Sequence, residues 1–381
     1  MYTPIRDDTR ELEVLVSQLA DQTGSRLATS QGEATVAAFV NGRLRHAGMG
    51  VGTYEIRVVP HRGHWYRWPA LLGLVAALLT PLLPSPSLLL ALVIFGWFLL
   101  DSLGMPLPSP GRRYASQNIV GTRAIAGAMG LEPAVPRWHI LLLAPLDMAL
   151  AHRGLAALCG TGPIAALARV AIATVTILAS GMSLLLPGLP WLISLPGVLG
   201  YLLLLVAALR PPTPANPDGG LATLATMLAA VQRLGTLTNV EVWAIAVGAV
   251  ASDQRGVTNL LRRFPFDRTR TLCIALEPLV GNQVVIASRE RAGGVADPLL
   301  LELALEADTA DPQIDAEPQI LAQRGRLASI LRRHGYRTMT ILARPAPGAL
   351  AQNSDPAAMP RLVERTTRLI VGIVRGLETK G

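Results

Sequence analysis

Two stretches of the chain carry no charged residue and are almost entirely apolar. Residues 68–100 are interrupted by Pro81 and a Pro-Ser-Pro turn at 84–86, and residues 170–209 are broken by a Pro-Gly-Leu-Pro turn at 187–190. A helix needs about 20 apolar residues to cross a bilayer, and tightly paired helices of about 16 to 18 residues are short but feasible. The pattern predicts two transmembrane helical hairpins, at residues 68–104 and 170–209, and therefore four membrane-spanning helices.

Buried helices of a soluble core are the alternative interpretation, which is disfavoured because four consecutive segments lack a polar face. Two hairpins cross the membrane an even number of times, so residues 1–67, 105–169 and 210–381 are expected on one side. Arginines such as Arg67 and Arg210 flank that side, whereas the hairpin tips carry none. The positive-inside rule then predicts an integral protein of the cell membrane whose soluble domain is cytoplasmic.

The charged parts of the chain alternate between helical and strand-like patterns. Apolar residues recur with helical spacing in residues 8–20, 31–47, 220–235, 319–334 and 359–377. Short β-rich runs occur at residues 54–59, 118–122, 139–144, 240–247, 272–276, 284–287 and 338–342. Apolar strands that alternate with helices are typical of a sheet covered on both faces. The pattern predicts one α/β domain with a mixed, largely parallel sheet, interrupted by the two hairpins.

Composition supports a membrane protein and argues against nucleic acid as a partner. The 381 residues are 51% hydrophobic and 16% charged, with a mean hydropathy of +0.40, too apolar for an ordinary soluble protein of this size. The net charge is +8, but the basic residues are interleaved with acidic ones and aromatic residues make up only 4%. The expected partners are therefore the lipid bilayer, and another membrane protein or a peptide, with no nucleic acid.

Three carboxylates are the best candidates for chemistry. Asp147 follows the run at 139–144, Asp218 precedes a Gly-Gly pair at the start of a predicted helix, and Glu277 ends the run at 272–276. An open α/β sheet gathers its functional residues at the carboxyl ends of its strands. The alternative is that Asp218 is a helix N-cap and that the other two are solvated strand ends. The chain contains neither a G-x-x-x-x-G-K-[ST] loop nor a G-x-S-x-G elbow, and no two histidines have metal-ligand spacing on a predicted helix. His61 and His64 lie just before the first hairpin, where contact with lipid headgroups is favoured over a metal.

Several short motifs occur in an order that resembles a known enzyme family. They are a Gly-Ser-Arg turn at 24–26, a Ser-Gln-Asn-Ile-Val strand at 116–120, Pro-Leu-Asp at 145–147, Asn-Pro-Asp-Gly-Gly at 216–220, Ile-Ala-Leu-Glu-Pro-Leu-Val-Gly at 274–281 and Asn-Ser-Asp at 353–355. In this order they resemble the di-zinc aminopeptidases of metallopeptidase family twenty-eight, whose relatives include glutamate carboxypeptidase and glutaminyl cyclase. The resemblance covers nearly all of the chain outside the hairpins and implies a zinc-aminopeptidase-like fold.

The resemblance also implies a metal site, from which this chain departs. In the family, two zinc ions are held by two histidines, two aspartates and a glutamate, and a neighbouring glutamate is the general base. At the matching positions Asp147 and Asp218 agree and Glu277 is a conservative replacement. The first histidine position is Pro145, the paired glutamates are Val250 and Ala251, and the last histidine falls near Ala351.

These departures predict that the site is vestigial. Three carboxylates cannot complete two zinc coordination shells, and a missing base removes a step typically worth about 10²–10⁴ in rate. The main hypothesis is a membrane-anchored protein that has lost di-zinc catalysis, needs no cofactor and acts as a binding or scaffolding module. The alternative is an active peptidase or hydrolase in which Asp147, Asp218 and Glu277 hold zinc or another divalent cation. A small transporter is disfavoured because neither uncharged run contains an ionisable residue.

Overall fold

The structure is a computed structural model of the chain. It describes residues 9–21, 26–60, 63–103, 112–125, 135–148, 150–151, 154–160, 162–186, 191–210, 213–214, 217–252, 255–290, 294–321, 325–345 and 358–380. The chain divides into two compact units. Unit 1 comprises residues 1–58, 115–149 and 216–381, and unit 2 comprises residues 59–114 and 150–215.

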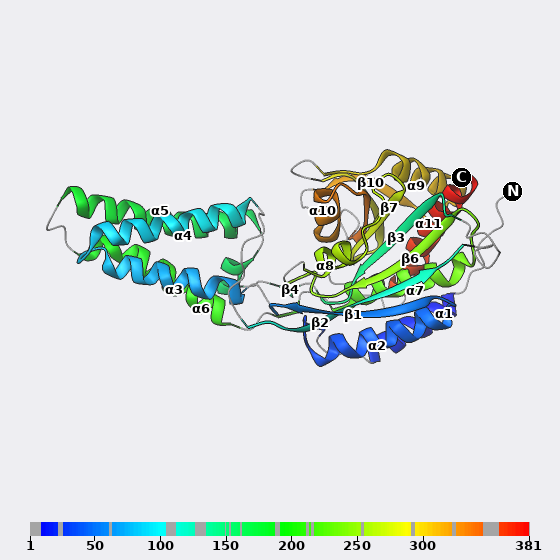
Figure 1. The fold of residues 1–381 in the computed structure, drawn as a ribbon, viewed down its shortest axis with the longest axis horizontal. Helices are drawn as coiled ribbons and strands as arrows, with labels where there is room; N and C mark the ends of the chain where they lie inside the picture. The colour runs from blue at the N-terminus through cyan, green and yellow to red at the C-terminus, as the bar shows by residue number, and fades with distance from the viewer. Residues whose placement is uncertain are drawn as a thin grey trace. The chain divides into compact units, whose positions relative to one another are not determined.

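Unit 1 is built on a mixed sheet (Figure 1). Its strands are β1 (Gly50–Val58), β2 (Tyr114–Arg123), β3 (Trp138–Pro145), β6 (Val240–Val247), β7 (Thr271–Leu279), β8 (Gln283–Glu290), β9 (Gly294–Val295), β10 (Ala316–Leu321) and β11 (Arg337–Arg344). The order is β1-β2-β6-β3-β7-β11-β8-β10, with β9 beside β8. The four central strands β6, β3, β7 and β11 are parallel, whereas β2 and β8 run antiparallel to their inner neighbours. The sheet is therefore mixed with a parallel centre.

Helices cover both faces of this sheet because the central strands are apolar on both sides. In β3, Ile140 and Leu142 face one core cluster and Leu141 and Leu143 face the other, and all four are buried. The first cluster is covered by α1 (Thr9–Asp21), α2 (Gln31–His46), α7 (Pro217–Leu234), α9 (Pro298–Ala310) and α11 (Ala358–Lys380). The second is covered by the shorter helices α8 (Arg255–Arg263) and α10 (Arg326–Arg333).

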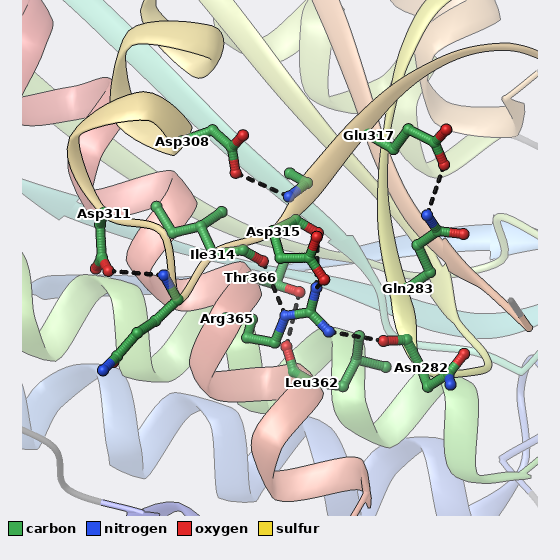
Figure 2. Close-up of polar contacts among 12 residues, drawn as sticks. Asn282, Gln283, Asp308, Asp311, Ile314, Asp315, Glu317, Leu362, Arg365 and Thr366 are labelled. Carbon is green, nitrogen blue, oxygen red and sulfur yellow. Dashed lines mark hydrogen bonds and ion pairs between the residues drawn. The ribbon is translucent and has the colours of Figure 1, made fainter.

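The helix α11 is fixed to two turns of unit 1 by one arginine. Arg365 donates to the backbone carbonyls of Asn282 and Ile314 at 2.8 Å each and forms an ion pair with Asp315 at 2.6 Å. Figure 2 shows the guanidinium surrounded by these acceptors. The long C-terminal helix is thus held against the sheet by directional bonds as well as by its apolar face.

Two local predictions are wrong. The helix predicted at residues 319–334 begins only at Arg326, because residues 316–321 form β10 and pair in parallel with β8. In residues 316–321, hydrogen bonding and packing against the neighbouring strand favour a strand, although the apolar residues there have helical spacing. The second failure is an omission, since the helices α8 and α9 were not predicted.

Unit 2 is a bundle of apolar helices. It contains α3 (Gly63–Leu79), α4 (Pro84–Ser102), α5 (Pro163–Leu185) and α6 (Leu195–Leu209), the short helices η1 (Gly154–Cys159) and η2 (Trp191–Ser194), and a two-stranded ribbon of β4 (Leu150–Ala151) and β5 (Thr213–Pro214). Large apolar side chains lie on its surface, among them Leu89 at 67% and Leu185 at 81% exposure. Such a surface is typical of a lipid-facing bundle.

Among the described residues, three helical segments are long and apolar enough to cross a membrane: 84–102, 163–185 and 191–209. The predicted number was four. The remaining apolar helix, residues 65–79, is shorter than this length, because the chain turns at Pro81 before a full span is complete. Of the four predicted spans, three therefore correspond to segments of this length, and the fourth corresponds to a shorter apolar helix.

The interior of unit 2 contains two polar features. Arg169 of α5 donates to Asp101 of α4 at 3.1 Å, stacks at 4.5 Å on the ring of Tyr66 and also donates to the carbonyls of Leu158 and Gly160. Asp101 and Arg169 each border one of the two uncharged runs. The hydroxyls of Thr80, Ser87 and Ser180 hydrogen-bond one another at 2.8–3.1 Å and are fully buried. Interhelical hydrogen bonds of this kind stabilise bundles whose surroundings are apolar.

Candidate functional site

The carboxyl edge of the parallel strands brings two of the three predicted carboxylates into one neighbourhood. Asp147 lies two residues beyond the end of β3, and Glu277 lies near the end of the adjacent strand β7. The positive charge of Arg326, the first residue of α10, acts to lower the pKa of both carboxyl groups. Asp218 lies in the first turn of α7, and its side chain is outside the described residues.

Asp147 is buried, with 2% of its surface exposed, and it accepts two backbone hydrogen bonds. The N–H of Val250 donates to Oδ1 and the N–H of Ala251 donates to Oδ2, each at 2.9 Å. Burial raises the pKa of Asp147 to about 6, although these N–H donors and Arg326 oppose the shift. The carboxylate is therefore bound by the turn that follows β6, a small nest of backbone donors.

A second buried acid shares this turn. Glu33, in the first turn of α2, is 2% exposed, and its carboxylate accepts from Ser116 Oγ at 2.7 Å and from the N–H of Thr29 at 2.5 Å. Ala249 adds a backbone hydrogen bond. Burial, and then the negative charge of Asp147, raise the pKa of Glu33 to about 7. Two acids thus meet around a turn of three successive residues.

Two of the residues whose backbone N–H groups donate to Glu33 have an unusual backbone conformation. Thr29 and Ala249 both have positive φ, at 68° and 55°, which non-glycine residues seldom adopt. Both residues direct their N–H groups at Glu33. Glu33 was not among the predicted site residues, although Ser30 and Glu33 have the spacing of a capping box and Ser30 Oγ does accept the N–H of Glu33.

Arg26, which belongs to the Gly-Ser-Arg turn, lies buried against the start of α7. It is 1% exposed, and a Cβ atom at Gly220 would lie 2.7 Å from its guanidinium. The backbone carbonyl of Arg26 accepts the N–H of Met148 at 2.9 Å, beside Asp147. A glycine at position 220 is what allows the first turn of α7 to approach this arginine.

Glu277 is bound by the N-terminus of α10. Its Oε1 accepts the N–H of Leu327 at 3.0 Å, and the backbone of Arg326 donates to it as well. Burial is the main cause that raises the pKa of Glu277 to about 7, with a contribution from the negative charge of Glu290. The fully buried Glu290 accepts from the N–H of Gly325 at 2.9 Å and pairs with Arg332 at 2.9 Å. Both acids are thus engaged by the helix terminus and by arginine.

Three described positions at this edge offer no ligand to a di-zinc centre. Zinc needs lone pairs from nitrogen, oxygen or sulfur, whereas Val250 and Ala251 present N–H donors to Asp147, and Pro145 has no donor or acceptor side chain. Within the described ranges, no three His, Cys, Asp or Glu side chains are grouped so that they could hold a metal ion. Ala351, near the expected last ligand, lies outside those ranges.

A further group of acids, at residues 308–317, is also engaged by the protein itself. Asp308 accepts the N–H of Ala316 at 2.8 Å, and Asp311 accepts the N–H of Gln313 at 3.1 Å (Figure 2). Asp311 also pairs with Arg368 at 3.2 Å. These carboxylates shape the turn between α9 and β10, which accounts for their position without a bound ion.

Comparison with known proteins supports the fold expected from the motifs. No protein-family model matches the chain, and a search of curated proteins finds no match. Among solved structures, BSAP, a zinc aminopeptidase from Bacillus subtilis, has 9% identity and a TM-score of 0.55 over 98% of this chain and 96% of that one. A leucine aminopeptidase precursor from Bacteroides thetaiotaomicron has 10% identity and a TM-score of 0.57 over 98% and 99%.

An Acidobacteriales bacterium glutaminyl cyclase has 10% identity and a TM-score of 0.56 over 100% of this chain and 98% of that one. The chain therefore has the mixed α/β fold shared by zinc aminopeptidases and glutaminyl cyclases. At these identities the likeness establishes the fold alone, because one fold supports many activities. The function has to be argued from the residues at the carboxyl edge.

Proposed function

We propose that this protein is a membrane-anchored, aminopeptidase-like protein that does not perform di-zinc catalysis and acts as a binding or scaffolding module. The observation that carries the proposal is the pair of hydrogen bonds from Val250 and Ala251 to Asp147. In the resembling family these two positions are glutamates. Here the turn offers backbone donors to a carboxylate instead of carboxylates to a metal.

The two arrangements make different chemical demands on Asp147. Each oxygen of Asp147 already accepts an N–H at 2.9 Å, and its pKa of about 6 indicates a poorly solvated carboxyl group. A divalent cation near Val250 and Ala251 would instead face the positive ends of two N–H dipoles. Within the described residues 248–252, this turn carries no carboxylate or imidazole that could take a proton from water, the role of the missing base.

Membrane anchoring is the second part of the proposal. It is supported by the three long apolar segments of unit 2 and by the exposed leucines on its helices. The arginines that flank the two uncharged runs favour a cytoplasmic location for unit 1. Protease protection in inverted membrane vesicles tests this: unit 1 should be digested from outside these vesicles, and protection of unit 1 would reverse the topology.

The catalytic claim is tested with purified full-length protein in detergent. Aminoacyl-p-nitroanilides and N-terminal glutaminyl peptides are offered with and without added Zn²⁺, beside a known zinc aminopeptidase as positive control. We expect no turnover above that of an Asp147→Asn, Asp218→Asn double variant. Zinc-dependent hydrolysis or cyclisation that disappears in the double variant would refute the proposal.

A second candidate is a hydrolase with a rearranged site. It is favoured by one observation, the pKa of about 7 for Glu277, which suits a general acid or base near neutral pH. In this case Asp147 and Glu277 would serve a hard divalent cation such as Mg²⁺ or Mn²⁺. Hydrolysis that requires Mg²⁺ or Mn²⁺ and is lost in Glu277→Gln would favour this candidate over the first.

A further inference from the structure

A basic and aromatic segment lies between α8 and β7, away from the carboxyl edge. Residues 262–270 read Arg-Arg-Phe-Pro-Phe-Asp-Arg-Thr-Arg. All four arginines are exposed, and none forms an ion pair within 4 Å with a described residue. The one acid, Asp267, directs its carboxylate at the N–H and hydroxyl of Thr269. The segment therefore presents a concentrated positive charge.

Half-buried aromatic rings lie beneath these arginines. Phe264 and Phe266 pack edge-on against Trp243 of β6, with ring centroids 5.3 and 4.8 Å apart, and Tyr54 of β1 packs against Phe264 at 5.3 Å. The guanidinium of Arg263 stacks over Tyr54 at 4.3 Å. We call this the basic–aromatic surface, which consists of Tyr54, Trp243, Arg262, Arg263, Phe264, Phe266, Arg268 and Arg270.

Folding alone explains only part of this surface. Arg262 and Arg263 lie in the last turn of α8, where positive charge stabilises a helix, and the rings close the core cluster on this face of the sheet. Arg270 lies outside any helix and has no such role. Arg268 hydrogen-bonds Tyr336 and Arg270 lies near Asp267, but four arginines in nine residues also repel one another, and one acid does not balance their charge.

The geometry of the rings limits the partners that this surface fits. The rings pack against one another, with Phe264 and Phe266 stacked at 28° and the other pairs edge-on at 68–90°, so they do not form the open platforms on which nucleic-acid bases stack. No ring of the surface belongs to the strongly exposed apolar residues, so none can insert into a bilayer as a wedge. Guanidinium groups beside half-exposed aromatic rings are typical of protein interfaces, and arginine pairs best with carboxylates and phosphates.

We propose that the basic–aromatic surface binds an acidic polypeptide segment of a partner protein. Its carboxylates pair with the arginines, and its apolar side chains cover the exposed parts of the rings. This inference is independent of whether the carboxyl edge is catalytic, because no residue of that edge takes part.

The test uses the full-length protein in phosphatidylcholine nanodiscs. The probe is a fluorescein-labelled 20-residue peptide that repeats Glu-Glu-Asp-Leu, followed by fluorescence anisotropy at low and at raised salt. A 20-nucleotide single-stranded RNA and phosphatidylserine vesicles serve as competing polyanions. The test variant is Arg262→Glu with Arg270→Glu, and the matched control is Arg289→Glu with Arg361→Glu, two exposed arginines outside the surface. Melting curves are recorded to check that both variants fold.

We expect the wild type and the control to bind the peptide alike and the test variant to bind at least about tenfold more weakly, with affinity falling as salt rises. Three results would overturn the inference: no peptide binding by the wild type, equal weakening in both variants, or tighter binding of the RNA or the vesicles than of the peptide. If the test variant fails to fold, Arg262→Gln with Arg270→Gln replaces it and must still weaken binding.

Discussion

Replacing Asp147 by alanine tests whether this carboxyl group is a structural acceptor. The change leaves the buried N–H of Val250 and the half-buried N–H of Ala251 without their partner, and a buried donor left in this way costs about 1–3 kcal/mol. It also removes a cost, because a pKa raised from 3.8 to about 6 makes the charged carboxyl unfavourable in the fold. Relative to low pH, where the group is protonated in both states, this destabilises the folded wild type by about 1.5 kcal/mol at pH 5 and about 3 kcal/mol at pH 7.

The net loss of unfolding free energy is therefore about 1–4 kcal/mol at pH 5, and it is smaller by about 1 kcal/mol at pH 7. The sign follows because the folded state retains a proton that the unfolded state releases, so the wild type becomes less stable as the pH rises. Asp147→Asn should behave differently: it keeps one acceptor oxygen and does not titrate, so its own stability gains no pH dependence from this position.

Thermal unfolding at both pH values, combined with hydrogen exchange of the peptide that spans residues 248–252, measures these effects. Faster exchange of the Val250 and Ala251 amides is expected in Asp147→Ala. The matched control is Asp267→Ala, which removes an exposed carboxylate that also accepts a backbone N–H and should barely change the melting temperature. Wild-type stability together with wild-type exchange at residues 250 and 251 would refute the structural role of Asp147.

Three other predictions concern the acids and the helix bundle. Because the pKa of Glu33 is raised from 4.5 to about 7, unit 1 should lose stability as the pH rises through this range, and melting curves of Glu33→Gln should show a weaker pH dependence. Asp101→Ala leaves Arg169 buried without its counter-charge and should cost about 3–5 kcal/mol in denaturant unfolding of the bundle. In Gly73→Ala the new Cβ would lie 2.1 Å from the Tyr201 ring, which should cost about 1–3 kcal/mol, whereas Gly96→Ala meets no atom within 4 Å and should fold normally. An unchanged pH profile, wild-type stability of Asp101→Ala, or equal stabilities of Gly73→Ala and Gly96→Ala would contradict the packing described.

Much of the architecture was accessible from the residue pattern. The apolar strands at 139–144 and 240–247 correspond to β3 and β6, and the ordered motifs indicated the fold that comparison with solved structures supports. Patterns of this kind report burial on both faces of a sheet, which is the property that defines its central strands. The edge strand β10 was not predicted, because a mostly exposed strand of six residues does not have the apolar run of a strand that is buried on both faces.

The candidate site was less accessible. Spacing along the sequence placed Asp147 and Glu277 at strand ends, but it could not show that backbone N–H groups from residues 250, 251 and 327 bind them. Such bonds depend on the path of a turn, here one with positive φ at Ala249, and backbone donors are the same in every residue type except proline. The pairing of Asp101 with Arg169 was hidden for a related reason, since the two lie 68 residues apart.

The central claim is that the carboxyl edge is held by the hydrogen bonds of the protein and is not a zinc site. Its most direct test is the zinc content of the full-length protein after incubation with Zn²⁺ and gel filtration, beside the Asp147→Asn, Asp218→Asn double variant. We predict the same content in both proteins, well below one ion per chain. A wild type that retains stoichiometric zinc, and a double variant that loses it, would contradict the account.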